Sequence, residues 1–207
     1  FMLKNSFMHI PGIGEKTERQ LWEQGILDWD ALKGHPHALS TSRMNTLLKW
    51  VETSRQHLAN REYDFFLKKL PAAQHWRLYP GLADSCAFID IETTGLDAWN
   101  AIITTIALYD GSKIKYYVNG DNLEDFVKDI QKYDLIVTYN GKTFDVPFIE
   151  SYFNTHMEQV HIDLRYILGS LGYKGGLKKC EKAMGLDRGD LNGVDGFFAV
   201  LLWKDYE

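Results

Sequence analysis

The sequence predicts an α/β fold in which a mixed β-sheet, flanked by helices, follows a small all-helical N-terminal domain. Three observations predict it. Residues 1–70 carry apolar side chains at helical spacing, residues 86–118 hold three short β-type runs, and residues 122–140 hold a helical segment followed by another buried run. A chain of 207 residues, 45% hydrophobic and 25% charged, is long enough for one full core and a smaller unit.

The first 70 residues are expected to form the helical domain. Apolar positions recur at helical spacing in EKTERQLWEQG and again from Ser40 to Leu58. Two prolines and a glycine then mark residues 71–84 as a linker or a crossing strand. We therefore divide the chain into a helical domain, residues 1–70, this linker, and an α/β domain, residues 85–207.

The α/β domain is expected to begin with an antiparallel meander. Its three runs are CAFIDIE, AIITTIALY and KIKYYV, each closed by Gly, Asp or Asn. A helix in NLEDFVKDIQKY and a buried strand in LIVTYN follow, and such a right-handed crossover makes the sheet partly parallel. The remainder is expected to be helical around residues 144–153, from 163, over 177–185 and from 195 to 206.

Two acidic residues stand out on the first strand of this sheet. Asp90 and Glu92 are two residues apart, so their side chains point to the same face of an otherwise apolar strand. Paired carboxylates there are costly to desolvate unless a cation or hydrogen-bond donors meet them, and Mg²⁺ or Mn²⁺ prefers such oxygen ligands. The alternative is that the two acids cap the following turn in solvent.

A third acid follows the buried strand LIVTYN. Asp145 lies five residues after Asn140, at the expected start of a helix. Ligands of open α/β sheets gather where strands end, so this carboxylate is expected to converge with Asp90 and Glu92 on a shared metal site. A helix N-cap, which Asp also favours, is the alternative for Asp145.

Charge and composition exclude several classes of protein. Residues 1–80 hold 11 Lys and Arg against 8 Asp and Glu, a net +3, whereas residues 81–207 hold 12 against 20, a net −8. This split fits one part that holds a polyanion and another that concentrates carboxylates. No apolar run is long enough for a membrane span, the start lacks a signal-peptide pattern, and two cysteines are too few for a disulfide framework. We expect a cytoplasmic protein without a membrane partner.

The acidic motifs resemble those of a known superfamily. DIETTG is similar to the first motif of the DEDD exonucleases, which have the ribonuclease-H-like fold, and YNGKTFDVPFI is similar to their second. HIDLRYILGSLGYKGGLKKCEKAMGL, with the GFFAVLLW that follows, resembles the predicted exonuclease family typified by bacterial YprB, so the resemblance spans about residues 85–207. It implies a ribonuclease-H-like mixed sheet and a metal-dependent nuclease that acts on ends of DNA or RNA.

The resemblance also implies roles for individual residues. Asp90 and Glu92 match the acids of the first motif and Asp145 matches that of the second, and together such acids hold two Mg²⁺ or Mn²⁺ ions. Asn140 matches a position near the substrate groove, and Thr93 is expected to contact nucleic acid with it.

The third motif departs from the family pattern. A His or Tyr should lie about one helical turn before the final acid, and neither Asp195 nor Asp205 has one there. We therefore expect the chain to end before its fourth ligand and general base, and to have little nuclease activity with Mg²⁺. Asp163, in HIDLRY, is a candidate accessory acid of the site, with helix capping as the equal alternative.

The helical N-terminus carries a second resemblance. HIPGIGEKTERQLWEQGI, within about residues 7–30, is similar to a helix-hairpin-helix motif, in which a glycine-rich turn lets backbone N–H groups approach a phosphate. Gly12, Gly14 and Lys16 are its expected nucleic-acid contacts. An ordinary turn between two helices is the alternative.

These expectations describe a metal-dependent nuclease, in particular a 3′-to-5′ exonuclease, that is delivered to a single strand or a strand end by its N-terminal hairpin. The alternative is a nucleic-acid-binding module with the same scaffold and no catalysis. A ribonuclease-H-like phosphotransferase or integrase is a third class, which the spacing of the acids fits less well. The sequence identifies no protein partner and does not distinguish DNA from RNA.

Overall fold

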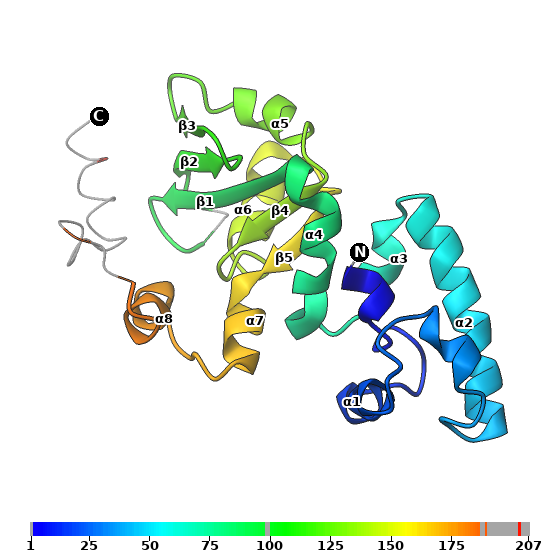
Figure 1. Ribbon diagram of the computed structural model, residues 1–207. Helices are drawn as coiled ribbons and strands as arrows, with labels where there is room; N and C mark the ends of the chain where they lie inside the picture. Colours follow the sequence, from blue (N-terminus) through cyan, green and yellow to red (C-terminus); the bar gives the residue numbers. More distant parts are fainter. Residues whose placement is uncertain (1, 98–99, 187–188, 190–202, 204–207) are drawn as a thin grey trace. The chain divides into compact units, whose positions relative to one another are not determined.

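The computed structural model describes residues 2–97, 100–186, 189 and 203 (Figure 1). The chain divides into two compact units, Phe1–Ala83 and Asp84–Glu207. The two acids considered for a third motif, Asp195 and Asp205, lie outside the described residues, as does most of the helix expected over 195–206. Among the helices of the described part, none has the length and apolar character needed to cross a membrane.

The first unit is helical, as expected. Its elements are η1 (Met2–Asn5), α1 (Glu15–Glu23), η2 (Ala31–Gly34), α2 (Thr41–Ala59), α3 (Tyr63–Leu67), η3 (Ala72–Leu78) and α4 (Tyr79–Leu82), where η denotes a 3₁₀ helix. Residues 71–84 are thus mostly helical turns, where the sequence predicts a linker or a strand. Pro71 immediately precedes η3 as its N-cap, and Pro80 lies in the first turn of α4, where the fixed φ of proline is favourable.

His9, from the HIPGIG stretch, belongs to the core of this unit. Its side chain is 2% exposed and packs against Trp29 and Phe66, and its Nε2 is 2.8 Å from the Ser54 hydroxyl. Burial is the main cause that lowers the pKa of His9 to about 3, so the imidazole is neutral near pH 7. The residue therefore anchors the start of the glycine turn from inside the unit.

The second unit is an α/β domain with a five-stranded sheet of order β3-β2-β1-β4-β5. The strands are β1 (Cys86–Thr93), β2 (Ile103–Tyr109), β3 (Ile114–Val118), β4 (Leu135–Thr138) and β5 (Val160–Asp163). The first three form the expected antiparallel meander, and β4 lies parallel to both β1 and β5. The 3₁₀ helix η4 (Ala83–Ser85) precedes β1, and the α-helices are α5 (Asp125–Ile130), α6 (Asp145–Phe153), α7 (Leu164–Ser170) and α8 (Leu177–Ala183). β5 is not expected from the sequence.

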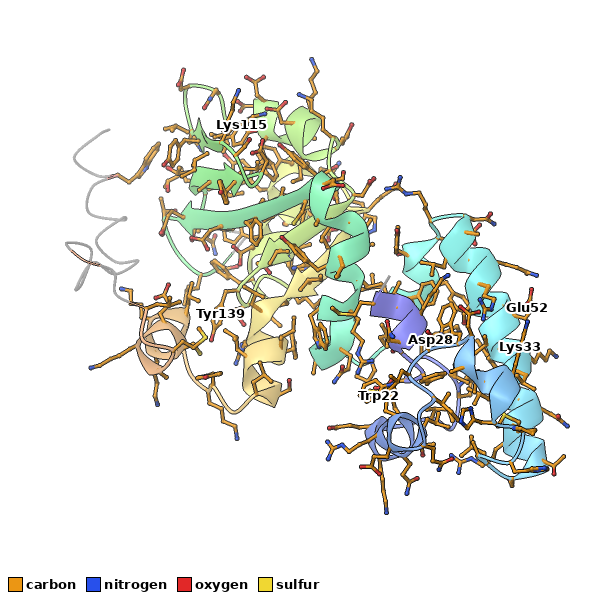
Figure 2. The ribbon with its side chains drawn as sticks, in the orientation of Figure 1. Trp22, Asp28, Lys33, Glu52, Lys115 and Tyr139 are labelled. Atoms are coloured by element: carbon orange, nitrogen blue, oxygen red, sulfur yellow. The ribbon has the colours of Figure 1, made fainter. Side chains whose placement is uncertain are left out.

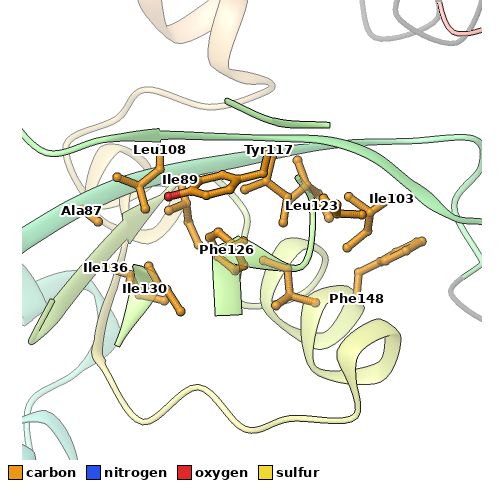
Figure 3. Packing of buried hydrophobic residues seen from close by; sticks show 13 residues of the cluster. Ala87, Ile89, Ile103, Leu108, Tyr117, Leu123, Phe126, Ile130, Ile136 and Phe148 are labelled. Carbon is orange, nitrogen blue, oxygen red and sulfur yellow. The ribbon is translucent and has the colours of Figure 1, made fainter. Parts of the chain in front are cut away.

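The hydrophobic core of the second unit lies on one face of the sheet (Figure 3). Ile89 of β1 points to this face, where Phe126 of α5 and Phe148 of α6 pack in the same cluster. Successive residues of a strand point to opposite faces, so Asp90 and Glu92 lie on the other side of the sheet. The core thereby fixes the direction in which β1 presents its acids.

Candidate functional site

The candidate site is built on β1, which carries two of the predicted acids. Asp90 pairs with Ala107 of β2 and Glu92 pairs with Thr105, so both side chains lie on the sheet face opposite the core. The register shifts immediately after Glu92, and an irregularity of this kind re-aims the chain at the end of a strand. β1 thus presents both carboxylates near its C-terminal end.

Asp145, the first residue of α6, reaches the same strand. β4 pairs with β1 along Cys86 to Phe88, so the backbone at Ile91 extends beyond this ladder. The Ile91 N–H donates a hydrogen bond to Oδ1 of Asp145 at 3.2 Å. Because Ile91 lies between Asp90 and Glu92, the structure brings Asp145 to the segment that bears the first two acids.

The charge of Asp90 acts on each of the other two carboxylates. Burial raises the pKa of the Asp90 carboxyl, although the residue as a whole is exposed. Burial, and then the charge of Asp90, raise the pKa of Glu92, which the charge of Lys178 partly lowers. Burial and the charge of Asp90 also raise the pKa of Asp145 to about 7. All three shifts disfavour the ionised forms, and a cation at this place would reverse them.

The donor set suits a hard divalent cation in its chemistry. Carboxylate oxygens are the ligands that Mg²⁺ and Mn²⁺ select, and a divalent charge offsets the repulsion among three acids. Within the described residues, however, no group of three or more His, Cys, Asp or Glu side chains is arranged to hold a metal ion. Convergence of the three acids on one ion therefore stays a prediction, and it requires movement of their side chains.

Asp163 has a structural task at the neighbouring strand end. It ends β5 and caps α7, where its Oδ1 accepts from the Arg165 N–H at 3.0 Å and from the Asn140 N–H at 2.8 Å. Its Oδ2 accepts from the Lys142 N–H at 3.0 Å. The carboxylate, on a residue that is 1% exposed, ties the loop after β4 to the start of α7. This arrangement matches the capping alternative for Asp163.

Asn140 and Gly141 shape the turn between β4 and α6. Asn140 has a φ of 70°, in the left-handed region that Asn tolerates better than most residues. A Cβ at Gly141 would lie 2.4 Å from the Thr138 hydroxyl oxygen, which accepts a hydrogen bond from the Gly141 N–H at 3.1 Å. The left-handed backbone favours Asn at position 140, and the close Thr138 side chain favours Gly at position 141. The turn leads into α6 at Asp145.

The other predicted contact residues are Thr93, the last residue of β1, and three residues of the first unit. Thr93 is buried, and its hydroxyl donates to the Gly95 carbonyl at 2.7 Å, so the hydroxyl is engaged inside the protein. Gly12, Gly14 and Lys16 belong to the first unit and are exposed. η1 and turns precede them in the chain, and α1 follows the glycine turn.

A group of residues around the end of β4 is not predicted from the sequence. They line a cavity of about 550 Å³ and include Tyr139, Arg165, Tyr173 and Lys174, with Asn140 as the one predicted member. Lys178 of α8, whose charge acts on Glu92, lies just beyond in the chain. The sequence feature that could have indicated this cavity is GYKGG, a basic and aromatic glycine-rich stretch after α7.

Comparison with solved structures gives partial likenesses. A family B DNA polymerase from the hyperthermophilic archaeon Pyrobaculum calidifontis is 17% identical, with a TM-score of 0.46, over 58% of this chain and 21% of that one. Brucella melitensis NrnC is 18% identical with a TM-score of 0.40, over 57% and 61% of the two chains. The structure of NrnC with bound Mg²⁺ is 21% identical with a TM-score of 0.40, over 54% and 58%. The chain thus spans less than two thirds of each of these proteins.

Comparison with curated proteins gives no match. A family model described as the RNase_H superfamily matches residues 87–207, which is more than half of the chain. The matched region holds most of β1, the other four strands and the three predicted acids. Its mixed five-stranded sheet flanked by helices confirms the ribonuclease-H-like fold expected from the sequence. The chain therefore belongs to the RNase_H superfamily.

Proposed function

We propose that the chain is a divalent-metal-dependent nuclease that hydrolyses phosphodiester bonds of DNA or RNA, and in particular a 3′-to-5′ exonuclease. The observation that carries the proposal is the hydrogen bond from the Ile91 N–H to the Asp145 carboxylate, between the two acids of β1. Membership of the RNase_H superfamily supports it. All three acids belong to the second unit, so the site does not depend on how the two units are arranged.

Each acid has a separate task in this proposal. Asp90 would be the carboxylate common to two Mg²⁺ or Mn²⁺ ions, Glu92 would help to hold the ion that activates water, and Asp145 would help to hold the other. When bound, such ions lower the pKa of a coordinated water and compensate the charge that develops on the phosphate. The raised pKa values of the three carboxyls mean that their ionised forms are disfavoured while no cation is bound.

Replacement of Asp90 by asparagine tests the proposal. We expect it to abolish Mn²⁺ binding in isothermal titration, because it removes the carboxylate that would be common to both ions. We also expect it to slow cleavage of a 5′-labelled single strand by about 100-fold, the scale on which removal of one electrostatic stabiliser acts. Single-turnover conditions, with protein in excess, make slow cleavage measurable, and shortening from the 3′ end gives a ladder of labelled products.

Asp121→Asn is the matched control, because Asp121 is an exposed acid in the turn after β3. It should leave Mn²⁺ binding and the cleavage rate unchanged. Mn²⁺ binding that persists in Asp90→Asn, or equal cleavage by this variant and the parent chain, contradicts the assignment of Asp90.

A nucleic-acid-binding module without catalysis is the second candidate, and one observation favours it. The described part of the chain contains no three His, Cys, Asp or Glu side chains already arranged to hold a metal ion. The same measurements separate the two candidates. A binding module would neither take up Mn²⁺ nor cut the strand, and would still bind the strand in EDTA.

We further propose that the glycine turn before α1 contacts a phosphate of the nucleic acid. Gly12, Gly14 and Lys16 are exposed there, and Nη2 of Arg43, from α2, donates to the Gly12 carbonyl at 3.1 Å. Lys16→Gln should weaken DNA binding and reduce the slope of log Kd against log salt by about one, as the loss of one phosphate contact does. Lys49→Gln, at an exposed position of α2, should change neither. A flat salt response of the parent chain contradicts any nucleic-acid role.

A further inference from the structure

A cavity of about 550 Å³ lies at the carboxyl end of β4, within the second unit. Its wall consists of Tyr139 and Asn140 after β4, Arg165 and Gly169 of α7, and the loop from Tyr173 to Gly176. This volume lies within the range of roughly 300 to 1,000 Å³ that is typical of small-ligand sites. The three acids of β1 and α6 are not among its lining residues, so the cavity is a separate feature.

Hydrogen bonds within the unit hold the wall of the cavity. The Tyr139 hydroxyl donates to the Gly175 carbonyl and lies 3.5 Å from Sγ of Cys180 in α8, and Figure 2 shows the Tyr139 side chain beside this helix. Gly175 has a φ of +117°, a conformation that glycine adopts at little cost. Elsewhere in the lining, the Arg165 guanidinium donates to Oδ1 of Asn140. The cavity is therefore built by specific contacts of its own residues.

The chemistry of this wall suits one nucleotide. Arg165 and Lys174 supply positive charge, and Tyr139 and Tyr173 supply aromatic rings. Among the described residues, no carboxylate lines the cavity, although residues 81–207 carry a net charge of −8. Aromatic rings stack on bases whatever their sequence, and cationic side chains neutralise phosphates, so this combination is typical of sites for single-stranded nucleic acid.

We propose that the cavity holds one nucleotide of a single-stranded substrate, with its base against Tyr173 and a phosphate against Lys174. The inference rests on the proposed nuclease function and adds the place where the strand is held. The path from Asn140, in the cavity wall, to Asp145 is five residues long and spans at most about 18 Å when fully extended. A strand seated in the cavity therefore has only a short distance to cross to reach the acids.

Binding without metal tests this inference separately from catalysis. The Asp90→Asn chain is titrated in EDTA into a fluorescent single-stranded oligonucleotide, and Tyr173→Ala and Lys174→Ala are made in that background. Each change is expected to raise Kd about tenfold, which corresponds to about 1.4 kcal/mol and lies within the range for loss of one stacked base. Lys174→Ala should also lower the slope of log Kd against log salt by about one. Tyr173→Phe, which keeps the ring, should bind like the Asp90→Asn chain.

Lys128→Ala, at an exposed position of α5, is the matched control and should bind like the parent. Thermal unfolding of each variant at the parent's midpoint excludes misfolding as the cause of weak binding.

Unchanged Kd in both Tyr173→Ala and Lys174→Ala overturns the cavity proposal, even where the parent chain cleaves strands and the nuclease proposal holds. Equal affinity for a free mononucleotide and for the strand also overturns it, because the cavity would then serve a free nucleotide. Absence of Mn²⁺ uptake and cleavage in the parent, with both tenfold effects present, overturns the nuclease proposal instead.

Discussion

Replacing Asp145 by asparagine should raise the free energy of unfolding of the metal-free protein by about 4 kcal/mol at pH 8. Asp145 is 4% exposed, and burial together with the charge of Asp90 raises its pKa from 3.8 to about 7. Asparagine keeps an oxygen that can accept the Ile91 N–H, which donates at 3.2 Å in the parent, and it removes the charge that burial opposes.

The sign follows from proton binding in the two states. Between pH 3.8 and about 7 the folded protein keeps a proton on Asp145 that the unfolded chain has released, so the folded state loses stability as the pH rises through this window. The pKa difference of about three, at about 1.36 kcal/mol for each unit, gives the expected gain. The difference between variant and parent should therefore be largest above pH 7 and fall below about 1 kcal/mol at pH 4.

Urea unfolding in EDTA, followed by circular dichroism across this pH range, measures the effect, and Asp121→Asn should show none of it. Added Mn²⁺ should reverse the order, because the parent chain gains stability from a bound ion and Asp145→Asn does not. The electrostatic account is contradicted if the difference in free energy of unfolding between Asp145→Asn and the parent is no larger at pH 8 than at pH 4. A variant that gains as much from Mn²⁺ as the parent shows that Asp145 is not a metal ligand.

The first four strands of the sheet can be predicted from the sequence, and the fifth cannot. β1 to β4 are apolar runs bounded by turn residues, and the helix between β3 and β4 specifies a crossover. β5 is four residues long, and two of them, His161 and Asp163, are polar residues that contact neighbouring elements. His161 lies 2.8 Å from the Thr138 hydroxyl through its Nε2, and Asp163 caps α7. Such residues hide the alternation on which strand prediction depends.

Part of the candidate site can likewise be predicted from the sequence, and part cannot. The positions of Asp90 and Glu92 on one strand face follow from the two-residue period, and the approach of Asp145 follows from its place after a strand end. The cavity cannot be predicted, because its wall joins Tyr139 to Gly175, which are 36 residues apart, through a loop whose shape depends on glycine conformation. Periodicity and turn residues report on neighbours in the sequence, so they do not predict such a long-range contact.

Glu18 and Arg77 form a buried ion pair in the first unit, with side chains 1% and 8% exposed and Nη2 of the arginine 2.7 Å from Oε2 of the glutamate. Oε1 of Glu18 also accepts from the Phe7 N–H at 2.6 Å and from the Met8 N–H at 3.2 Å. The Arg77 guanidinium lies over the ring of Trp22, at 5.7 Å from its centroid. One carboxylate thus joins the N-terminal turns, α1 and η3.

Glu18→Gln should lower the free energy of unfolding of this unit by about 3 to 5 kcal/mol, because it leaves the Arg77 charge buried without a counter-charge. Urea unfolding followed by tryptophan fluorescence reports on the unit, since four of the six tryptophans lie within residues 1–83. Glu23→Gln, at an exposed position of the same helix, should change the value by less than about 0.5 kcal/mol. A loss below about 1 kcal/mol in Glu18→Gln contradicts the prediction.

The double variant Glu18→Met with Arg77→Met separates the two tasks of the carboxylate. Replacing both charges by apolar side chains removes the unpaired buried charge, so stability should recover relative to Glu18→Gln. Recovery should be incomplete, because the N–H groups of Phe7 and Met8 lose their acceptor, and an unsatisfied buried donor costs about 1 to 3 kcal/mol. Complete recovery would show that the ion pair alone, and not the anchoring of the N-terminal turns, gives Glu18 its weight in the stability of this unit.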